Sequence, residues 1–313
     1  MPDRVRVIAI KVLIAMLTCS WPVIARPQSK PLLGSTTQLH EKDFWRSIRE
    51  HEYRVPSGNS VRDLATELSA GLSSPDPELR DELATTILSV WIYKTRIIDV
   101  DMLRQFIAEW LNNLTPKGGG RTTVPTWGRS FSALMLSVAI ARDNADPFLT
   151  DGEFRKIWDS AVAYLRTEND LRGFDSQIGW IHSTAHTADL LKFLARSRYF
   201  SRSDQAAMLV VIRNKLSTAN LVFTYGEDER LARAVLSVIR RPDFDDAGFA
   251  TWSKETLPKL AVTSTPNQAV LRSAQNLKNF FSKLVVILTN ESDQTPAVRS
   301  AYELACATLK NEF

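Results

Sequence analysis

Apolar residues recur at the spacing of an α-helix in one segment after another of this 313-residue chain. Ser74-Pro75-Asp76-Pro77 has the residue types of a helix start, and apolar residues from Leu79 to Trp91 follow at helical spacing. Because no long segment alternates apolar and polar residues, the sequence predicts little or no sheet. Proline or glycine separates several of the segments. Further helices are predicted over residues 99–114, 126–142, 151–167, 177–197, 203–218, 227–240, 245–257, 266–289 and 294–311.

This pattern indicates an all-α fold. Helices of about 12 to 20 residues with short connections favour antiparallel helix hairpins. Stacked hairpins form either an open α/α superhelix of the HEAT or armadillo kind or a closed α/α toroid. We expect the superhelix and keep the toroid as the alternative. No strict repeat signature is visible, so any repeated units have diverged in sequence.

The composition is that of an ordinary globular protein, with 44% hydrophobic and 24% charged residues. Helical repeats often form single units of this length, so we expect one all-helical domain over residues 40–313. The formal net charge is +4, and no long run of Lys or Arg occurs. Nucleic-acid binding therefore has little support from the sequence.

Residues 1–25 have the features of a signal peptide. Arg4, Arg6 and Lys11 precede a short apolar run, and Val23-Ile24-Ala25 offers suitable residues for cleavage. The apolar run is shorter than the about 20 residues that a transmembrane helix needs. We expect an exported protein, periplasmic or secreted, without membrane contact once the signal is removed; an uncleaved anchor is the alternative.

Residues 26–39 are rich in Pro, Ser, Thr and Gln, and we interpret them as a flexible lead-in. Of the 2 Cys, Cys19 lies in the predicted signal, where a lipoprotein would carry its lipid, although Thr18 before it fits that alternative poorly. Cys306 lies in the apolar pattern of the last predicted helix. We expect it to be a buried apolar side chain rather than a reactive thiol.

The segment 168–191 contains the densest group of candidate functional residues. His182 and His186 stand one helical turn apart, and Asp189 follows on the same helical face. The rest of this predicted helix is mainly apolar, so the polar stripe should be buried and should need partners. Trp180 is expected to pack near the start of the helix.

Three interpretations of the stripe follow from its chemistry. Two imidazoles at this spacing and a carboxylate can bind a divalent metal such as zinc, or serve as an acid and a base. The zinc-hydrolase motif H-E-x-x-H is absent, because Ser183 stands at the glutamate position. The stripe can also be a buried hydrogen-bonded network, or it can line a ligand-binding groove.

Charged residues elsewhere in the chain are candidate partners of the stripe. We expect Asp170 and Arg172, or the carboxylates of Glu227, Asp228 and Glu229, to meet it. The three consecutive acids also have a local explanation, because acidic residues in the first turn of a helix interact favourably with the helix dipole. Arg230 either pairs across helices or is solvated.

Four segments carry a family resemblance. They are D-L-R-G with G-W-I-H-S-T-A-H-T-A-D-L-L inside residues 168–191, and the shorter pieces 129–134, 147–149 and 227–232. Together they resemble domain-of-unknown-function family 2785, from about residue 75 to 240. The resemblance implies a mostly helical fold and a structural or functional role for Trp180, His182, His186 and Asp189. It implies no reaction, substrate or cofactor.

Two functional hypotheses follow. The first is a non-catalytic scaffold or binding module that holds a protein or peptide, and the lack of a complete catalytic motif favours it. The second is a metal-dependent or acid/base enzyme centred on His182, His186 and Asp189. No nucleophile elbow G-x-S-x-G and no S-x-x-K motif occurs. The glycine-rich segment 117–121 lacks the pattern of a phosphate-binding loop.

Overall fold

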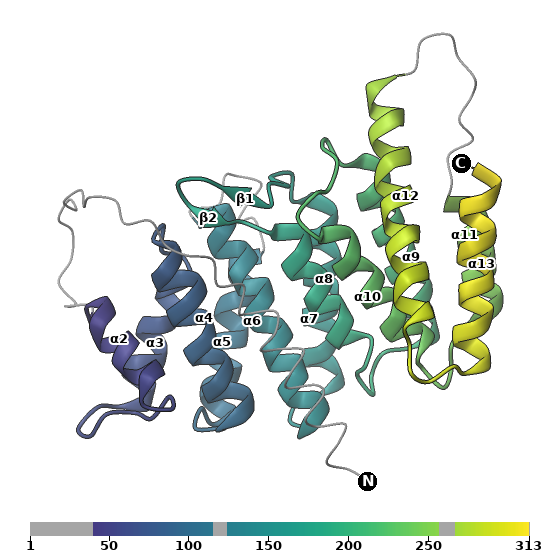
Figure 1. The fold of residues 1–313 in the computed structure, drawn as a ribbon. Coiled ribbons are helices and arrows are strands. Elements are labelled where there is room, and N and C mark those ends of the chain that lie inside the picture. The colour runs from purple at the N-terminus through teal and green to yellow at the C-terminus, as the bar shows by residue number, and fades with distance from the viewer. Residues whose placement is uncertain (1–39, 115–123, 257–266, 313) are drawn as a thin grey trace.

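The computed structural model describes residues 40–114, 124–256 and 267–312. The predicted signal peptide, the lead-in and the loop 117–121 lie outside these ranges. The described residues are mostly helical, which confirms the all-α fold class (Figure 1).

The helices are α2 (Lys42–Glu50), α3 (Val61–Gly71), α4 (Thr85–Ser89) between the π-helical turns η1 (Glu78–Ala84) and η2 (Val90–Lys94), α5 (Val100–Leu114), α6 (Thr126–Ala145), α7 (Asp151–Thr167), α8 (Ser183–Leu194), α9 (Arg202–Thr218), α10 (Glu227–Ile239), α11 (Asp246–Thr256), α12 (Gln268–Thr289) and α13 (Pro296–Glu312).

Local chemistry fixes the ends of several helices where the sequence predicts them. Helix α7 covers the predicted residues 151–167, and a capping box closes its start. Thr150 accepts a hydrogen bond from the backbone N–H of Glu153, whose carboxylate accepts one from the backbone N–H of Thr150. Ser201 and Asp204 form the same box at the start of α9.

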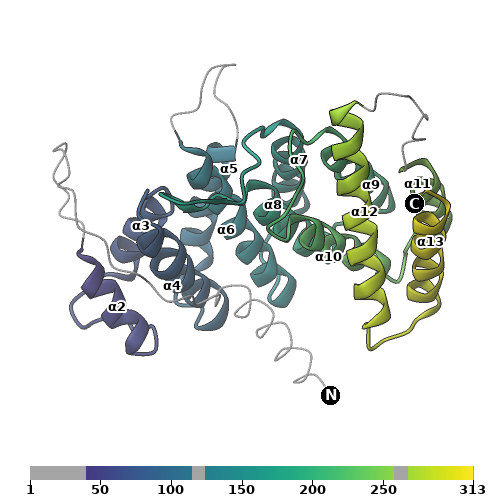
Figure 2. The same cartoon turned by 45° about the horizontal axis from the view of Figure 1, so that its top comes forward.

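The helices form two layers. One layer, called here the first layer, contains η1–α4–η2, α6, α8, α10 and α12, each packed against the next. The second layer contains α5, α7, α9, α11 and α13, also packed in that order. The chain alternates between the layers as it crosses the molecule, and α2 and α13 lie at opposite ends (Figures 1 and 2).

Hydrogen bonds between two pairs of neighbouring helices join residues at nearly constant sequence separation. The bonds from Arg230 of α10 to Asp189 of α8, and from Arg196 in the turn after α8 to Ser237 of α10, each span 41 positions. The two bonds between α11 and α13 span 54 and 55 positions. A constant separation means that the two helices of each pair run parallel, because antiparallel neighbours would pair at steadily changing separations.

One short sheet interrupts the helices, which agrees with the expected little or no sheet, but its second strand occupies residues that the sequence assigned to the helix 177–197. Strands β1 (Phe174–Asp175) and β2 (Gly179–Trp180) pair in antiparallel fashion, with Phe174 opposite Trp180. The Asp175 carboxylate accepts hydrogen bonds from the backbone N–H groups of Gln177 and Ile178 and so closes the turn. Each strand has two residues, which is too short for an alternating pattern to be visible in the sequence.

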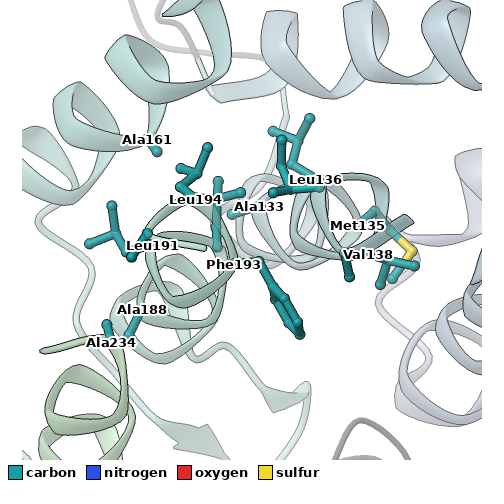
Figure 3. Packing of buried hydrophobic residues seen from close by; sticks show 14 of the residues in the cluster. Ala133, Met135, Leu136, Val138, Ala161, Ala188, Leu191, Phe193, Leu194 and Ala234 are labelled. Carbon is teal, nitrogen blue, oxygen red and sulfur yellow. The ribbon is translucent and has the colours of Figure 1, made fainter. Parts of the chain in front are cut away.

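The apolar core lies between and within the layers. Figure 3 shows Leu194 of α8 directed toward Ala161 of α7, whereas Phe193 points away from both. Phe193 therefore marks the side of the first layer that faces away from the second layer. In the described ranges, no helix combines the length and apolar character needed to span a bilayer.

One minor prediction concerns a single side chain. Cys306 is free, but it is half-buried rather than buried, because α13 lies at the end of the second layer. Only one neighbouring helix of that layer packs beside it.

Candidate functional site

Helix α8 is buried along its whole length. Every residue from Ser183 to Leu194 is buried, because α6, α7 and α10 pack around the helix. Five of its residues other than His186 are polar or charged: Ser183, Thr184, Thr187, Asp189 and Lys192. Buried polar groups are costly unless they are hydrogen-bonded or paired, so the partners of these side chains define the site.

His182 lies just before the helix, not inside it. The sequence predicts one helix over 177–197, whereas α8 begins at Ser183 and Trp180 belongs to strand β2. His182 is the residue that precedes the helix, with φ 48° and ψ 33° in the left-handed region. The imidazole still lies beside His186, with ring centroids 5.6 Å apart, and it stacks on Trp180 at 4.2 Å.

The strand replaces the predicted helical turn because Arg80 binds its carbonyl groups. Arg80 of η1 is fully buried, and its Nη2 donates to the carbonyls of Ile178 at 2.8 Å and Trp180 at 3.2 Å. Gly179 between them has φ +82°, and a Cβ there would lie 2.8 Å from the Cβ of Pro77. Sequence reasoning missed Arg80, although its place one turn before Leu83 on the apolar face of the predicted helix is a signal of burial.

His186 has a neutral partner. Its Nδ1 lies 2.9 Å from the hydroxyl of Ser130 on α6, and its ring meets Phe131 edge-on at 4.7 Å. Both partners belong to the segment 129–134 that carries part of the family resemblance. The polar contact of His186 is thus a hydrogen bond between two buried helices.

Asp189 has two cationic partners. Its Oδ1 accepts from Lys192 Nζ at 2.8 Å, and its Oδ2 accepts from Arg230 Nη1 at 2.6 Å. Lys192 is one turn further along α8, and Arg230 comes from α10. Arg230 therefore pairs across helices, which was one of its two predicted roles. Lys192 is a residue that the sequence interpretation missed, although its i+3 spacing from Asp189 was visible.

The expected partners Asp170 and Arg172 do not meet the stripe through their charges. They pair with each other at 2.8 Å, and Arg172 also pairs with Asp175 of the hairpin turn at 2.8 Å. The backbone carbonyl of Asp170 accepts a hydrogen bond from the Ser183 hydroxyl at 2.7 Å. The two residues therefore brace the hairpin and the loop before α8.

The three acids at the start of α10 also have local partners. Glu227 accepts from the backbone N–H of Tyr225 at 2.9 Å, and Asp228 accepts from that of Glu229 at 2.8 Å. Glu229 pairs with Arg233 one turn along at 2.7 Å. Their helix-start explanation fits these contacts, and none of these three contacts reaches His182, His186 or Asp189.

A family model described as "Protein of unknown function (DUF2785)" matches residues 119–286. This chain belongs to that family. The matched range includes α6, α8 and α10 and therefore contains the stripe with its partners Ser130, Lys192 and Arg230. The resemblance expected from the sequence is confirmed, with a matched range that begins and ends later. Comparison with curated proteins and with solved structures gives no match.

The electrostatics of this DUF2785 site keep the imidazoles neutral. Burial, followed by the Arg230 cation, lowers the pKa of His182 to about 3, although Asp189 and the Tyr225 carbonyl act in the opposite direction. The same two causes hold the pKa of His186 well below its usual range. Burial alone would raise the pKa of Asp189, but Lys192 and Arg230 lower it to about 2. At neutral pH the site therefore holds two neutral imidazoles and one charged carboxylate.

These contacts argue against the stripe as an acid and a base, and against it as a metal site. An efficient acid or base has a pKa near the working pH, and both imidazoles are far below it. Each oxygen of Asp189 already accepts from a cation, so the carboxylate is not free to bind a metal. Within residues 40–114, 124–256 and 267–312, no group of three or more His, Cys, Asp or Glu side chains is arranged to hold a metal ion. The geometry is that of a buried network.

An exposed aromatic cluster, called here the aromatic surface, covers this network. Phe174 is 45% exposed and Tyr225 is 49% exposed, while Trp180 between them is half-buried. Their rings meet Trp180 edge-on, with centroids at 5.0 Å for Phe174 and 5.9 Å for Tyr225. A Cβ on Gly173 would lie 2.3 Å from the Tyr225 ring, so only glycine leaves room for it.

The depressed pKa of His182 predicts a loss of stability in acid. Its unfolded pKa is about 6.5 and its folded pKa about 3, so the unfolded chain binds more protons between these values and stability falls as pH drops below 6.5. The free energy of unfolding should fall by about 2 kcal/mol more in the wild type than in His182→Asn between pH 7 and pH 5. Asn suits the variant because it tolerates the left-handed conformation.

Urea titrations of both proteins at each pH measure this difference. The comparison is necessary because burial raises the pKa of Asp81 to about 7, which stabilises the fold as pH falls through 7 and opposes the His182 effect. Both proteins contain Asp81, so its contribution cancels. Parallel pH profiles of the two proteins would mean that His182 is solvated in the folded state.

Proposed function

We propose that this protein is a non-catalytic binding module whose two helix layers form an open α/α superhelix of the HEAT or armadillo kind. The constant separation of the bonds within each layer and the alternation of helices between layers support a stack of helix pairs. The opposite positions of α2 and α13 favour the open form over the closed toroid (Figures 1 and 2).

The observation that carries the binding role is the aromatic surface. Single exposed apolar residues are ordinary, but adjoining exposed aromatic rings on a rigid support are typical of contact sites for other molecules. Here Trp180 stacks on the buried His182, and Arg80 holds the backbone beneath it. Part of the entropy of ordering such side chains is therefore already lost before any partner binds.

The occupant that we propose is a peptide or a segment of another protein with an apolar or aromatic anchor. Such a segment gains the burial of Phe174 and Tyr225 without requiring a charged group at the anchor point. We also propose that the protein is exported through the signal peptide predicted over residues 1–25. A partner would then be an extracytoplasmic protein or peptide.

Selection from a library of short random peptides tests the binding role. The wild type should enrich peptides with aromatic anchors, and the double variant Phe174→Ser/Tyr225→Ser should bind them at least about tenfold more weakly, as expected for contact residues of this kind. Both residues are about half exposed, so the variant should fold normally, which circular dichroism can check.

The matched control is Ile97→Ser/Val210→Ser, which removes two apolar side chains of similar exposure, 39% and 41%, away from the aromatic surface. It should bind the selected peptides as the wild type does. Failure to enrich any peptide, or equal losses in the two double variants, would refute the proposed function.

A further inference from the structure

The polar stripe of α8 continues beyond Asp189. Phe193 follows Asp189 by four residues on the same face of α8, and Arg196 lies in the turn just after the helix ends at Leu194. Figure 3 shows that Phe193 points away from the second layer. The extended stripe therefore lies on the face of the first layer that the second layer leaves uncovered.

The parallel helix α10 places a basic stripe beside it. Arg230, Arg233 and Ser237 recur at helical spacing on α10, and Arg240 is the residue that follows the helix. Arg230 faces Asp189, and Ser237 faces Arg196. Positive side chains of α8 and α10 thus follow the same line along the first layer.

Positive charge exceeds negative charge at the far end of this line. Lys192 Nζ and Arg196 Cζ both lie over the Phe193 ring, 4.9 Å and 5.2 Å from its centroid. Arg240 pairs with Glu291, which follows α12. The carboxylate whose charge acts on Arg196 is Asp189, which Lys192 and Arg230 already share.

Arg196 is oriented by a neutral group. Its Nε donates to the Ser237 hydroxyl at 3.1 Å, and within the described parts of the chain it forms no ion pair. Part of the side chain is exposed, but loss of water contact and then the charge of Arg240 lower its pKa to about 10, against the opposing charge of Asp189. Arg196 therefore presents an accessible guanidinium that has lost part of its water contact and is repelled by neighbouring cations. A bound oxyanion would offset both effects.

We infer that Arg196 binds a carboxylate of the peptide that the aromatic surface holds, so that the ligand is a segment with an apolar anchor and an acidic residue. This inference rests on the proposed function and specifies the partner's chemistry. Arg196 presents the planar donor fork that matches a carboxylate, Ser237 holds it in place, and Lys192 and Arg240 add to the local positive potential.

The length of the stripe sets the spacing within that ligand. Helix α8 has 12 residues, about 18 Å along its axis, and it separates His182, which stacks under Trp180, from Arg196 in the turn after the helix. An extended peptide covers that length in about six residues. The acidic residue should therefore lie about six residues from the aromatic anchor.

Fluorescence anisotropy with three labelled synthetic peptides tests the inference. The first carries Trp-Leu at one end and Glu-Glu at the predicted spacing, joined by Ser and Gly. The second has half the spacing, and the third has Gln-Gln in place of Glu-Glu. The first peptide should bind about tenfold more tightly than the other two, a ratio typical of one well-placed charged contact.

Variants assign the effect to the guanidinium. Arg196→Gln should weaken binding of the first peptide to the level of the third and leave the third unchanged, while Arg196→Lys should retain part of the affinity. Arg166→Gln is the matched control, because Arg166 is also exposed but lies on α7 in the second layer. It should bind all three peptides as the wild type does.

The failures of the two proposals are distinguishable. Equal binding of the first and third peptides, with both lost in Phe174→Ser/Tyr225→Ser, would overturn the carboxylate site and leave the binding module intact. Displacement of the first peptide by a single-stranded oligonucleotide at lower concentration than by free Glu-Glu peptide would assign the site to phosphate and also overturn it. Absence of binding by all three peptides would count against the aromatic surface as well.

Discussion

Replacing Asp189 with Ala should lower the free energy of unfolding by about 3 to 5 kcal/mol, because it removes one partner of a buried set of charges. Lys192 is 3% exposed and Arg230 is partly buried, and both donate to the Asp189 carboxylate. Without it, two cations remain close together in a region from which water is largely excluded. Urea denaturation followed by circular dichroism measures the loss.

Two further variants separate charge from packing. Asp159→Ala removes an exposed carboxylate from α7 and should change stability by less than about 0.5 kcal/mol. Adding Lys192→Met to Asp189→Ala should recover part of the loss, because it removes one of the two cations that lose the Asp189 carboxylate. A loss below about 1 kcal/mol in Asp189→Ala would mean that water reaches the site and that the network is a surface feature.

Thermal melting of the wild type and of Asp189→Ala tests the interpretation of the stripe as a metal site. A network of hydrogen bonds and ion pairs should melt at the same temperature with and without a chelator, since a ligand stabilises a protein only if it binds the folded state. A wild-type melting temperature that falls on chelation, and an Asp189→Ala variant that does not respond, would restore the metal site as an explanation of the stripe.

Much of the fold could be predicted because its signals are local. Apolar residues at helical spacing and the breaks between them lie within one segment, and capping residues such as Thr150 and Glu153 mark a boundary directly. This is why α7 occupies the predicted residues 151–167. The order of the helices in two layers depends on contacts between segments about 40 to 55 positions apart, which a single sequence does not display.

The start of α8 could not be predicted for the same reason. Ile178, Trp180 and Ile181 continue the apolar spacing of the helix, so the pattern alone extends the helix back to residue 177. Arg80, 98 positions before Ile178, binds that carbonyl and the carbonyl of Trp180. A local preference for helix is overridden by a distant side chain, and His182 takes the left-handed conformation that turns the chain into α8.

The candidate site was accessible from sequence in part. The spacing of His182, His186 and Asp189 predicted their proximity, and their apolar neighbours predicted their burial. Arg230 was predicted either to pair across helices or to be solvated, and the structure shows the first. Ser130 could not be found in this way, because a lone serine on an apolar helix has many ordinary roles and its contact spans 56 positions.

Replacing Arg80 with Ala should also lower the free energy of unfolding by about 3 to 5 kcal/mol, because it leaves the neighbouring Asp81 as an unpaired, largely buried charge. Arg80 Nε lies 2.6 Å from Asp81 Oδ1. The variant also removes donors from the carbonyls of Ser74, Ile178 and Trp180, each of which then lacks a buried partner. Urea denaturation measures the total, and hydrogen exchange over residues 172–182 should rise more than elsewhere.

The pH dependence of this deficit identifies its cause. The pKa of Asp81 is already raised by burial to about 7, with the charge of Arg80 as the largest opposing influence, so loss of Arg80 should raise it further. Asp81 is then neutral in the folded variant below pH 7, and the deficit at pH 5 should be smaller than at pH 7.5. Arg80→Lys should restore little stability, because an ammonium group lacks the planar fork that reaches both strand carbonyls. A deficit that is independent of pH and fully repaired by Lys would show that Arg80 acts through packing of its methylene groups, and that the hairpin beneath the aromatic surface forms without it.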